Sequence, residues 1–266
     1  MHLLLIHQNF PGQFRDLMPA WLAAGHRITA IGNQPPDPDA SPPEGLRVVH
    51  YTLNEASAEE QHQARAQAVE QIAIWLLEQG QPPDLILVHS GWGEALGLRR
   101  VFPHTPTITY PELWVTPAAL GIGIDPLLHR NDQLPGLEPL LERQNLITEL
   151  SICQADAVVV PSHSQRASFP APLRRGIQVI AEGVNLERVR PNPAATVQLP
   201  SGLRLRAGEP IVTLVSRNLE PLRGLRAALA AWPLVAQAVP DAQLVLVGNE
   251  GPGYGLEAPR SSSHLV

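Results

Sequence analysis

Short apolar runs recur along the chain, and amphipathic or small-residue segments separate them. The runs in the first part cover residues 2–7, 27–32, 47–52, 84–90, 105–110, 156–162 and 177–183. Runs rich in Val, Ile and Leu, without strict alternation, are typical of parallel strands that are covered on both faces. Their alternation with helical segments predicts the α/β class, with a doubly wound parallel sheet.

The helix expected over residues 57–80 has the clearest signals. Ser57 and Glu60 have the spacing of a capping box, and Gly80 provides a stop. Its apolar face is expected to consist of Val69, Ile72, Ala73 and Leu76.

Two further helices are expected in the first part of the chain, over residues 13–24 and 136–152. The first should end before Gly25. The apolar side of the second should consist of Leu137, Leu140, Leu141 and Ile147.

A second set of elements follows a stretch rich in Pro, Arg and small residues. Strands are expected at 210–217 and 242–248, with a helix at about 222–239 that is broken or kinked at Pro233. We therefore predict a first domain at 1–186, a linker at 187–208, the start of a second Rossmann-like domain at 209–251 and a disordered tail at 252–266. Two parallel strands and one helix cannot cover both faces of a sheet, so we expect this second domain to be incomplete.

Charge and cysteine content exclude some classes of protein. The formal net charge is -6, all 19 basic residues are arginine, and no basic run occurs, which disfavours nucleic acid as a partner. Cys153 is the single cysteine, and its apolar surroundings predict a buried, reduced thiol, as in a cytoplasmic protein. The sequence shows neither a signal peptide nor a membrane span, and contact with the inner face of a membrane remains compatible with it.

Candidate site residues follow the predicted strands. Gly12 lies between the first strand and its helix, where a glycine lets the backbone approach a ligand or simply forms a turn. His89, Trp92 and Glu94 follow the fourth strand, near the crevice that open α/β sheets use for ligands. Trp92 could stack on a sugar and the other two could bind hydroxyl groups; packing in the interior is the alternative.

Two arginines flank the turn after the strand at 210–217. Arg217 and Arg223 could pair with phosphate oxygens, and an exposed loop is the alternative. The turn after the first strand lacks the G-x-G-x-x-G spacing of a dinucleotide-binding fold, and this disfavours a nicotinamide enzyme or a nucleotide-sugar epimerase. Ser90 lacks the G-x-S-x-G context of a hydrolase elbow.

Four stretches in this order resemble the group 1 glycosyltransferases, family 4 of the sequence classification. They are "MHLLLIHQNFPGQFRDLMPAWLAAGHRITAIG", "VHSGWGEALGLRRVFP", "AEGVNLERVRPNP" and "SRNLEPLRGLR". The resemblance covers Met1 to about Gly251 and implies a GT-B fold, in which two Rossmann-like domains bind the acceptor and a nucleotide-sugar donor. It also implies transfer with retention of anomeric configuration, to a glycan or a lipid-linked acceptor.

The resemblance assigns roles to several residues. Arg217 and Arg223 match the family's Arg and Lys that hold the donor diphosphate, and Gly12, Gly248 and Glu250 are further donor-binding candidates. Tyr110 and Glu112 occupy the place where many relatives have a histidine that contacts the transferred sugar. We expect Tyr110 to bind the acceptor, together with Trp92 and Glu94, and Glu112 and His89 to be catalytic.

Other positions depart from the family pattern. Glu182 replaces an Asn of the family, and Gly183 is expected in a turn with positive φ. The family's pair of glutamates, seven residues apart, would lie beyond this chain, so we expect activity of this chain to be doubtful; a non-catalytic carbohydrate- or nucleotide-binding remnant is the alternative. No bound metal or cofactor is expected, and the nucleotide sugar is a substrate.

Overall fold

The computed structural model describes residues 1–33, 41–53, 60–120, 134–219 and 223–249. The chain divides into two compact units. The first comprises Met1–Val115 and Pro135–Asn185, and the second comprises Thr116–Leu134 and Leu186–Val266. The predicted tail at 252–266 lies outside the described residues.

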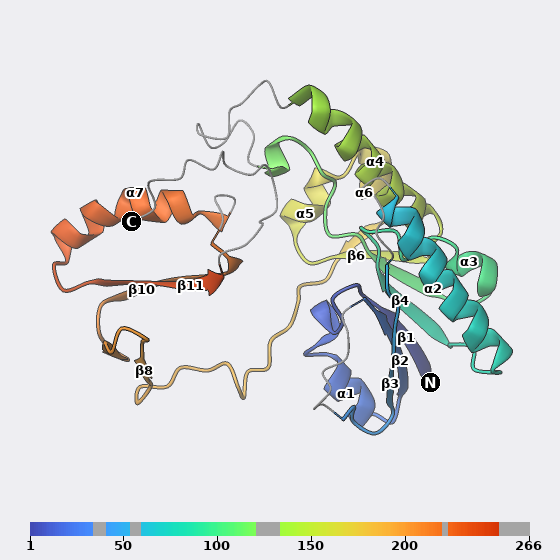
Figure 1. The fold of residues 1–266 in the computed structure, drawn as a ribbon, viewed down its shortest axis with the longest axis horizontal. Helices are drawn as coiled ribbons and strands as arrows, with labels where there is room; N and C mark the ends of the chain where they lie inside the picture. Colours follow the sequence, from blue (N-terminus) through green and yellow to red (C-terminus); the bar gives the residue numbers. More distant parts are fainter. Residues whose placement is uncertain (34–40, 54–59, 121–133, 220–222, 250–266) are drawn as a thin grey trace. The chain divides into compact units, whose positions relative to one another are not determined.

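A seven-stranded sheet forms the centre of the first unit (Figure 1). Its strands are β1 (His2–Ile6), β2 (Arg27–Gly32), β3 (Leu46–His50), β4 (Leu85–His89), β5 (Thr107–Tyr110), β6 (Ala157–Val160) and β7 (Ile177–Val179). Their order is β3-β2-β1-β4-β5-β6-β7, and every neighbouring pair is parallel. The strand order reverses direction at β1, between β2 and β4, as the doubly wound prediction requires.

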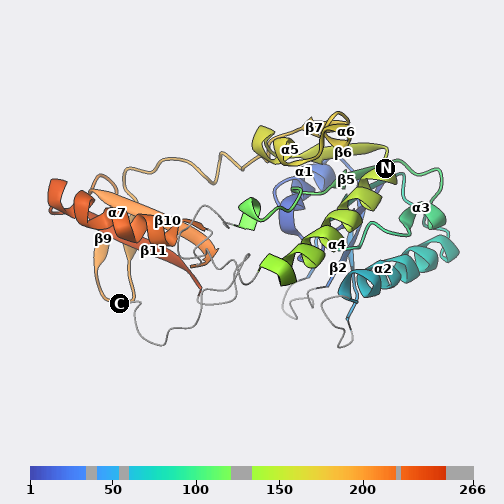
Figure 2. The ribbon, with the colours of Figure 1, turned by 90° about the horizontal axis from the view of Figure 1, so that it is seen from above.

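Helices cover the sheet on both faces. They are η1 (Gly12–Phe14), α1 (Met18–Ala23), α2 (Gln61–Glu78), α3 (Leu98–Val101), α4 (Leu134–Cys153), α5 (His163–Ser168) and α6 (Ala171–Arg174). The short η2 (Ala118–Leu120) belongs to the second unit. In Figures 1 and 2, α2, α3 and α4 lie on one side of the sheet and α1 on the other. This arrangement leaves the carboxyl ends of the strands at one edge, where the loops carry the candidate residues.

Alternate residues of β1 divide the core into two layers. Leu4 and Ile6 pack in a fully buried cluster with the α2 side chains, whereas Leu3 and Leu5 pack with Phe14 on the opposite face. This division explains the continuous apolar run in β1, since successive side chains point to opposite faces of a strand. The expected apolar face of α2 is confirmed, because Val69, Ala73 and Leu76 are fully buried and Ile72 packs against them.

The predicted helix boundaries needed correction at two places. α2 begins at Gln61, with Glu60 as its N-cap. The capping box expected from Ser57 and Glu60 involves Ser57, which lies outside the described residues. The helix expected at 13–24 is split into η1 and the short α1, since only part of that segment packs against the sheet.

The buried face of α4 is more polar than its pattern predicted. Leu140 is exposed, whereas Asn145 and Thr148 are buried together with Leu141. Asn145 exchanges two hydrogen bonds with the backbone of Val115: its Oδ1 accepts from the amide at 2.9 Å and its Nδ2 donates to the carbonyl at 2.8 Å. The helix therefore fixes a loop by hydrogen bonds where apolar packing was expected.

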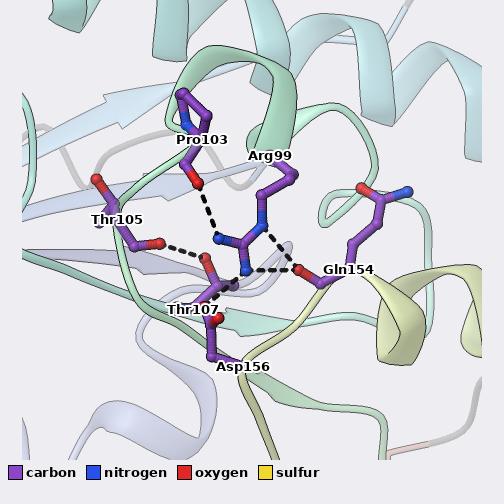
Figure 3. Close-up of polar contacts among 6 residues, drawn as sticks. All are labelled: Arg99, Pro103, Thr105, Thr107, Gln154 and Asp156. Atoms are coloured by element: carbon purple, nitrogen blue, oxygen red, sulfur yellow. Dashed lines mark hydrogen bonds and ion pairs between the residues drawn. The ribbon is translucent and has the colours of Figure 1, made fainter.

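Arg99 of α3 joins three segments of the first unit (Figure 3). Its Nε and Nη2 donate to the carbonyl of Gln154, after α4, at 3.1 and 2.8 Å. Nη1 donates to the Pro103 carbonyl at 3.2 Å, and Nη2 also contacts Asp156 Oδ2 at 2.6 Å. The same Oδ2 accepts from the backbone amide of Thr107 at 2.8 Å, so one guanidinium ties the starts of β5 and β6 to α3.

The second unit contains one parallel crossover. β10 (Ile211–Asn218), α7 (Leu225–Ala238) and β11 (Gln243–Asn249) form it, and β10 pairs with β11. Of the break or kink expected at Pro233, a break does not occur, because α7 runs continuously through it; a proline removes one backbone hydrogen bond, which a helix of this length tolerates. The stretch expected to be an irregular linker contains a short antiparallel hairpin, β8 (Thr196–Gln198) and β9 (Arg204–Arg206).

Two further expectations from the sequence concern the burial of Cys153 and membrane-spanning helices. Cys153, at the end of α4, is exposed, so the expectation of a buried thiol is wrong; the last residue of α4 lies beyond the part that packs on the sheet. Of the helices in the described residues, none has the length and apolarity needed to cross a membrane.

Candidate functional site at the carboxyl ends of β1, β4 and β5

Three neighbouring strands bring their carboxyl ends together at this site. β4 lies between β1 and β5, so His7, directly after β1, comes close to His89, the last residue of β4. His89 is paired in register with Tyr110, the last residue of β5, and Glu112 follows two residues later. This edge is where open α/β sheets bind ligands.

The two histidine rings lie against each other in the interior. Their centroids are 4.4 Å apart with an interplanar angle of 39°. His7 is 5% exposed and His89 is 3% exposed. Neither ring nitrogen of His89 makes a hydrogen bond to a described residue, although Nε2 lies within ion-pair distance of Glu112, and buried polar atoms without a hydrogen bond are uncommon.

Glu112 lies beside both rings and is half-buried. Its Oε1 is 3.3 Å from Nε2 of His89, within ion-pair distance. The same Oε1 accepts a hydrogen bond from Gln13 Nε2 at 3.0 Å. Glu112 has φ of 58°, a left-handed conformation that costs energy for a residue with a Cβ, and such strain clusters at functional sites.

The first βα loop closes the site from the other side. Nε2 of His7 lies 2.5 Å from Gln13 Oε1, and Nδ1 of His7 accepts from the backbone amide of Asn9 at 2.9 Å. Gly12 has φ of +46°, and a Cβ there would overlap the His7 ring. In this structure Gly12 is therefore required by the close approach of the loop to His7.

The pKa values of His7 and Glu112 are both lowered, by different causes. Burial lowers the pKa of His7 to about 4, with a smaller contribution from the neighbouring His89. The contact with His89 lowers the pKa of Glu112, against the effect of its own burial. At neutral pH the site therefore contains a neutral His7 and a carboxylate at Glu112.

Tyr110 and Glu182 form a second polar contact at the same edge. The Tyr110 hydroxyl donates to Glu182 Oε1 at 2.6 Å, and the Tyr110 ring stacks at 6.0 Å from His89. Burial, with help from Glu182, raises the pKa of Tyr110. Gly183, expected in a turn with positive φ, does not have one, because the chain continues here without reversing into a tight turn.

A cavity of about 240 Å³ lies next to these residues, within the first unit. Its walls are mainly apolar side chains of β4, β5 and β6 and of the segment 13–17. Gln13, Tyr110 and Glu182 are among its polar lining residues, so the cluster borders a partly open cavity.

Trp92 and Glu94 lie apart from this cluster. Glu94 is fully buried in the core next to α2, where Tyr51 donates to its Oε1 at 3.0 Å and Arg65 Nε is 3.9 Å away. Burial raises the pKa of Glu94. Trp92 is half-buried, and its carbonyl accepts from His62 Nδ1 at 3.0 Å if that nitrogen carries the hydrogen. Both residues have interior contacts here, as in the packing alternative.

The donor-binding candidates belong to the second unit. Arg217 lies near the end of β10 at a register shift with β11, and Arg223 immediately precedes Gly224, the N-cap of α7. Both arginines are exposed. A Cβ on Gly248 would lie 2.7 Å from the Ser216 carbonyl oxygen, so Gly248 permits close packing of β11 on the end of β10; Glu250 lies outside the described residues.

Sequence reasoning missed His7 and Gln13. Their signal was present in "HQNFPGQF", where polar residues surround the candidate Gly12 at the end of the first strand. The side-chain contacts across the sheet edge show what they do. As for metals, the described residues contain no group of three or more His, Cys, Asp or Glu side chains that could hold an ion.

The parallel sheet with crossovers on both faces, followed by a second parallel βαβ unit, defines the GT-B class of glycosyltransferase folds. A family model for the glycosyl transferase family 4 group matches residues 24–189, more than half of the chain. The chain belongs to this family.

Curated relatives and solved structures agree with this placement. The chain is 34% identical over 112 residues to the "GDP-mannose-dependent alpha-(1-6)-phosphatidylinositol monomannoside mannosyltransferase" of Mycobacterium tuberculosis, in strains CDC 1551 / Oshkosh and ATCC 25618 / H37Rv. The alignment covers 41% of this chain and 28% of the length of these relatives. The crystallised OtsA apo structure is 14% identical, with a TM-score of 0.59 over 95% of this chain and 66% of OtsA; this likeness concerns the fold.

Proposed function

We propose that this protein takes part in transferring a sugar from a nucleotide diphosphate sugar to a hydroxyl group of a glycan or lipid-linked acceptor, with retention of anomeric configuration. The observation that carries the proposal is the cluster of His89 and Glu112 at the carboxyl edge of the sheet, in a chain of family 4. The first unit would bind the acceptor and the second would begin the donor site. The proposed place of action is the cytoplasm, at the inner face of the membrane if the acceptor is a lipid.

In this reaction the acceptor oxygen bonds to the anomeric carbon, the bond from that carbon to the diphosphate oxygen breaks, and the proton of the acceptor hydroxyl passes to the leaving diphosphate. Because Glu112 remains a carboxylate at neutral pH, it accepts a hydrogen bond from the acceptor hydroxyl and orients its oxygen. A lowered pKa makes Glu112 a weak base, so orientation is its main role, with His89 holding the carboxylate.

Arg217 and Arg223 would neutralise the leaving diphosphate. Guanidinium groups pair with phosphate oxygens in charge-assisted contacts, and fixed positive charge at that place lowers the barrier as negative charge builds. The βα position of both arginines in the second unit supports this proposal.

A transfer assay tests the function. The protein, and any longer product of the same gene, would be incubated with radiolabelled UDP-, GDP- and ADP-sugars and with oligosaccharide or lipid acceptors. We expect one donor to give a labelled product with retained anomeric configuration by NMR. Failure of every donor with both proteins would overturn the proposal.

A binding experiment tests the two arginines separately. We expect the R217A/R223A double variant to lose measurable heat with nucleoside diphosphates in calorimetry, whereas the exposed control Arg204→Ala should bind like the parent. Unchanged affinity in the double variant would contradict the assigned role. Binding without transfer would instead support the second candidate, a non-catalytic nucleotide- or carbohydrate-binding protein.

A further inference from the structure

The Gln13 side chain joins two groups that would otherwise have no contact with each other. It touches His7 through Oε1 and Glu112 through Nε2, at 2.5 and 3.0 Å. It comes from the first βα loop, 99 residues away from Glu112 in the sequence.

A series of hydrogen bonds runs from the backbone amide of Asn9 through His7 and Gln13 to Glu112. The direction of each bond in this series follows from the first donor, the Asn9 amide. The backbone amide of Asn9 can only donate, so Nδ1 of His7 must accept, and a neutral His7 ring then carries its hydrogen on Nε2. That N–H donates to Gln13, which must present its oxygen to His7. The amide nitrogen of Gln13 is then left to donate to Glu112.

The consequence is a fixed orientation of the Glu112 carboxylate. Both of its contacts, to Gln13 and to His89, fall on Oε1. Among the described residues, no side chain binds Oε2, and the side chain as a whole is 39% exposed. Oε2 is therefore the oxygen that an incoming hydroxyl can reach.

We propose that Gln13 is a positioning residue, which His7 holds in one orientation and which turns Oε2 of Glu112 toward the acceptor hydroxyl. The inference rests on the proposed function for the identity of the incoming group. The arrangement of His7, Gln13 and Glu112 does not depend on it.

Two NMR measurements on the intact protein test the arrangement without any substrate. Long-range ¹H–¹⁵N correlations should show His7 with its hydrogen on Nε2, and ¹³C titration should follow the Glu112 carboxyl. In Gln13→Met, which keeps the length but removes both polar atoms, the pKa of Glu112 should rise because the carboxylate loses a donor. Gln8→Met, in the same loop, is the matched control and should leave the titration of Glu112 unchanged.

In Gln13→Glu, two carboxyl groups face each other. We expect coupled titration of the pair, with one pKa raised. A hydrogen on Nδ1 of His7, or a Glu112 titration that is the same in the parent and in Gln13→Met, would overturn the proposal. Chemical-shift spectra of each variant would show whether it folds like the parent.

An activity measurement separates this proposal from the proposed function. With a protein that transfers sugar, Gln13→Met should lower kcat by about 10- to 100-fold while KM for the donor stays unchanged, because only the hydroxyl is misplaced. If no transfer occurs with any donor while both NMR results hold, the proposed function fails and the arrangement stands. Normal kcat in Gln13→Met would overturn the positioning role.

Discussion

At the scale of single residues, the site depends on close contacts in the first βα loop. Gly12 lies against His7, and His7 lies against His89 and Gln13. Each contact leaves little room, so the geometry of Glu112 depends on side chains far from it in the sequence. Residues that look like simple turn formers therefore control the shape of the site.

Gly12→Ala should destabilise the protein by about 2 kcal/mol, because the new Cβ meets the His7 ring and the backbone has positive φ. Gly25→Ala is the matched control: Gly25 has φ of +77°, but nothing lies within 4 Å of its Cβ position. For Gly25→Ala we expect a loss of about 1 kcal/mol in the free energy of unfolding, from the backbone conformation alone. Urea denaturation measures both, and equal losses would contradict the packing explanation.

His7 should make stability fall as the solution becomes acidic. Its pKa is about 4 when folded and 6.5 in the reference state, so folding favours the neutral ring. That contribution is fully present above pH 6.5 and is lost as pH falls towards 4. Between pH 7 and pH 5 the parent should lose about 2 kcal/mol more of its unfolding free energy than His7→Gln does.

Denaturation curves of the parent and of His7→Gln at pH 7 and pH 5 measure this difference in unfolding free energy. His2 and His62, whose pKa values burial also lowers, remain in both proteins, so the comparison isolates His7. The exposed His104→Gln variant should keep the parent's pH dependence. If the free energy of unfolding changes equally with pH in His7→Gln and in the parent, His7 does not titrate as described.

At the scale of elements, hydrogen bonds hold the loops around the sheet. Asn145 of α4 binds the backbone of Val115, in the loop that follows Glu112. Arg99 of α3 binds the segment between α4 and β6. The helices on this face therefore support the candidate site through polar contacts as well as through apolar packing.

Arg99→Lys should cost about 1 kcal/mol of unfolding free energy, because one ammonium cannot replace a planar group that serves two carbonyls and Asp156. Asp156 is 52% exposed, so solvent screening keeps this value modest. The control is Arg100→Lys, next to it in α3, since Arg100 is 75% exposed and binds Glu70. For Arg100→Lys we expect a loss of a few tenths of a kcal/mol in the free energy of unfolding. Thermal or urea unfolding measures both variants. A larger loss for Arg100→Lys than for Arg99→Lys would contradict this explanation.

At the scale of the whole molecule, the two units differ in how well they are buried. The sheet of the first unit has core residues on both faces. In the second unit, Val212, Val215, Leu234 and Val247 are between 47% and 70% exposed. An apolar surface of this kind needs a cover in a stable protein.

A chain of residues 1–186 should therefore fold alone. We expect cooperative urea unfolding and the same tryptophan indole shifts in NMR as in the intact protein, because its core lies within these residues. Residues 187–251 alone should associate or remain unfolded, since their apolar side chains lack a second layer. Loss of cooperative unfolding in 1–186 would show that the first unit depends on the rest of the chain.

The sequence predicted the strands better than the helices. A buried parallel strand leaves a continuous apolar run, and all nine predicted strands formed within a few residues of their expected bounds. The buried faces of the helices were predicted less accurately. In α4, Asn145 and Thr148 are buried, and an apolar pattern cannot reveal buried polar residues. The hairpin of β8 and β9 also escaped, since strands of three residues are too short to show a period.

The candidate site was only partly accessible to sequence reasoning. All three of His89, Tyr110 and Glu112 lie at or after the ends of predicted strands. The rule for ligand sites in α/β sheets selected His89, and the family resemblance selected Tyr110 and Glu112. Trp92 and Glu94 met the same rule, yet Glu94 is fully buried in the core, and Trp92 contacts His62 through its backbone carbonyl. His7 and Gln13 were not selected, because their partners His89 and Glu112 belong to other strands and the loops after them.

By itself, the sequence determined the α/β class, the order of the strands along the chain and membership of the glycosyltransferase family, because these depend on local apolar patterns and on motifs that are contiguous. Tertiary structure alone decided which polar side chains meet. Hydrogen bonds between Gln13 and Glu112, or Asn145 and Val115, join residues far apart in the sequence, and only the packing of the strands brings them within reach of one another.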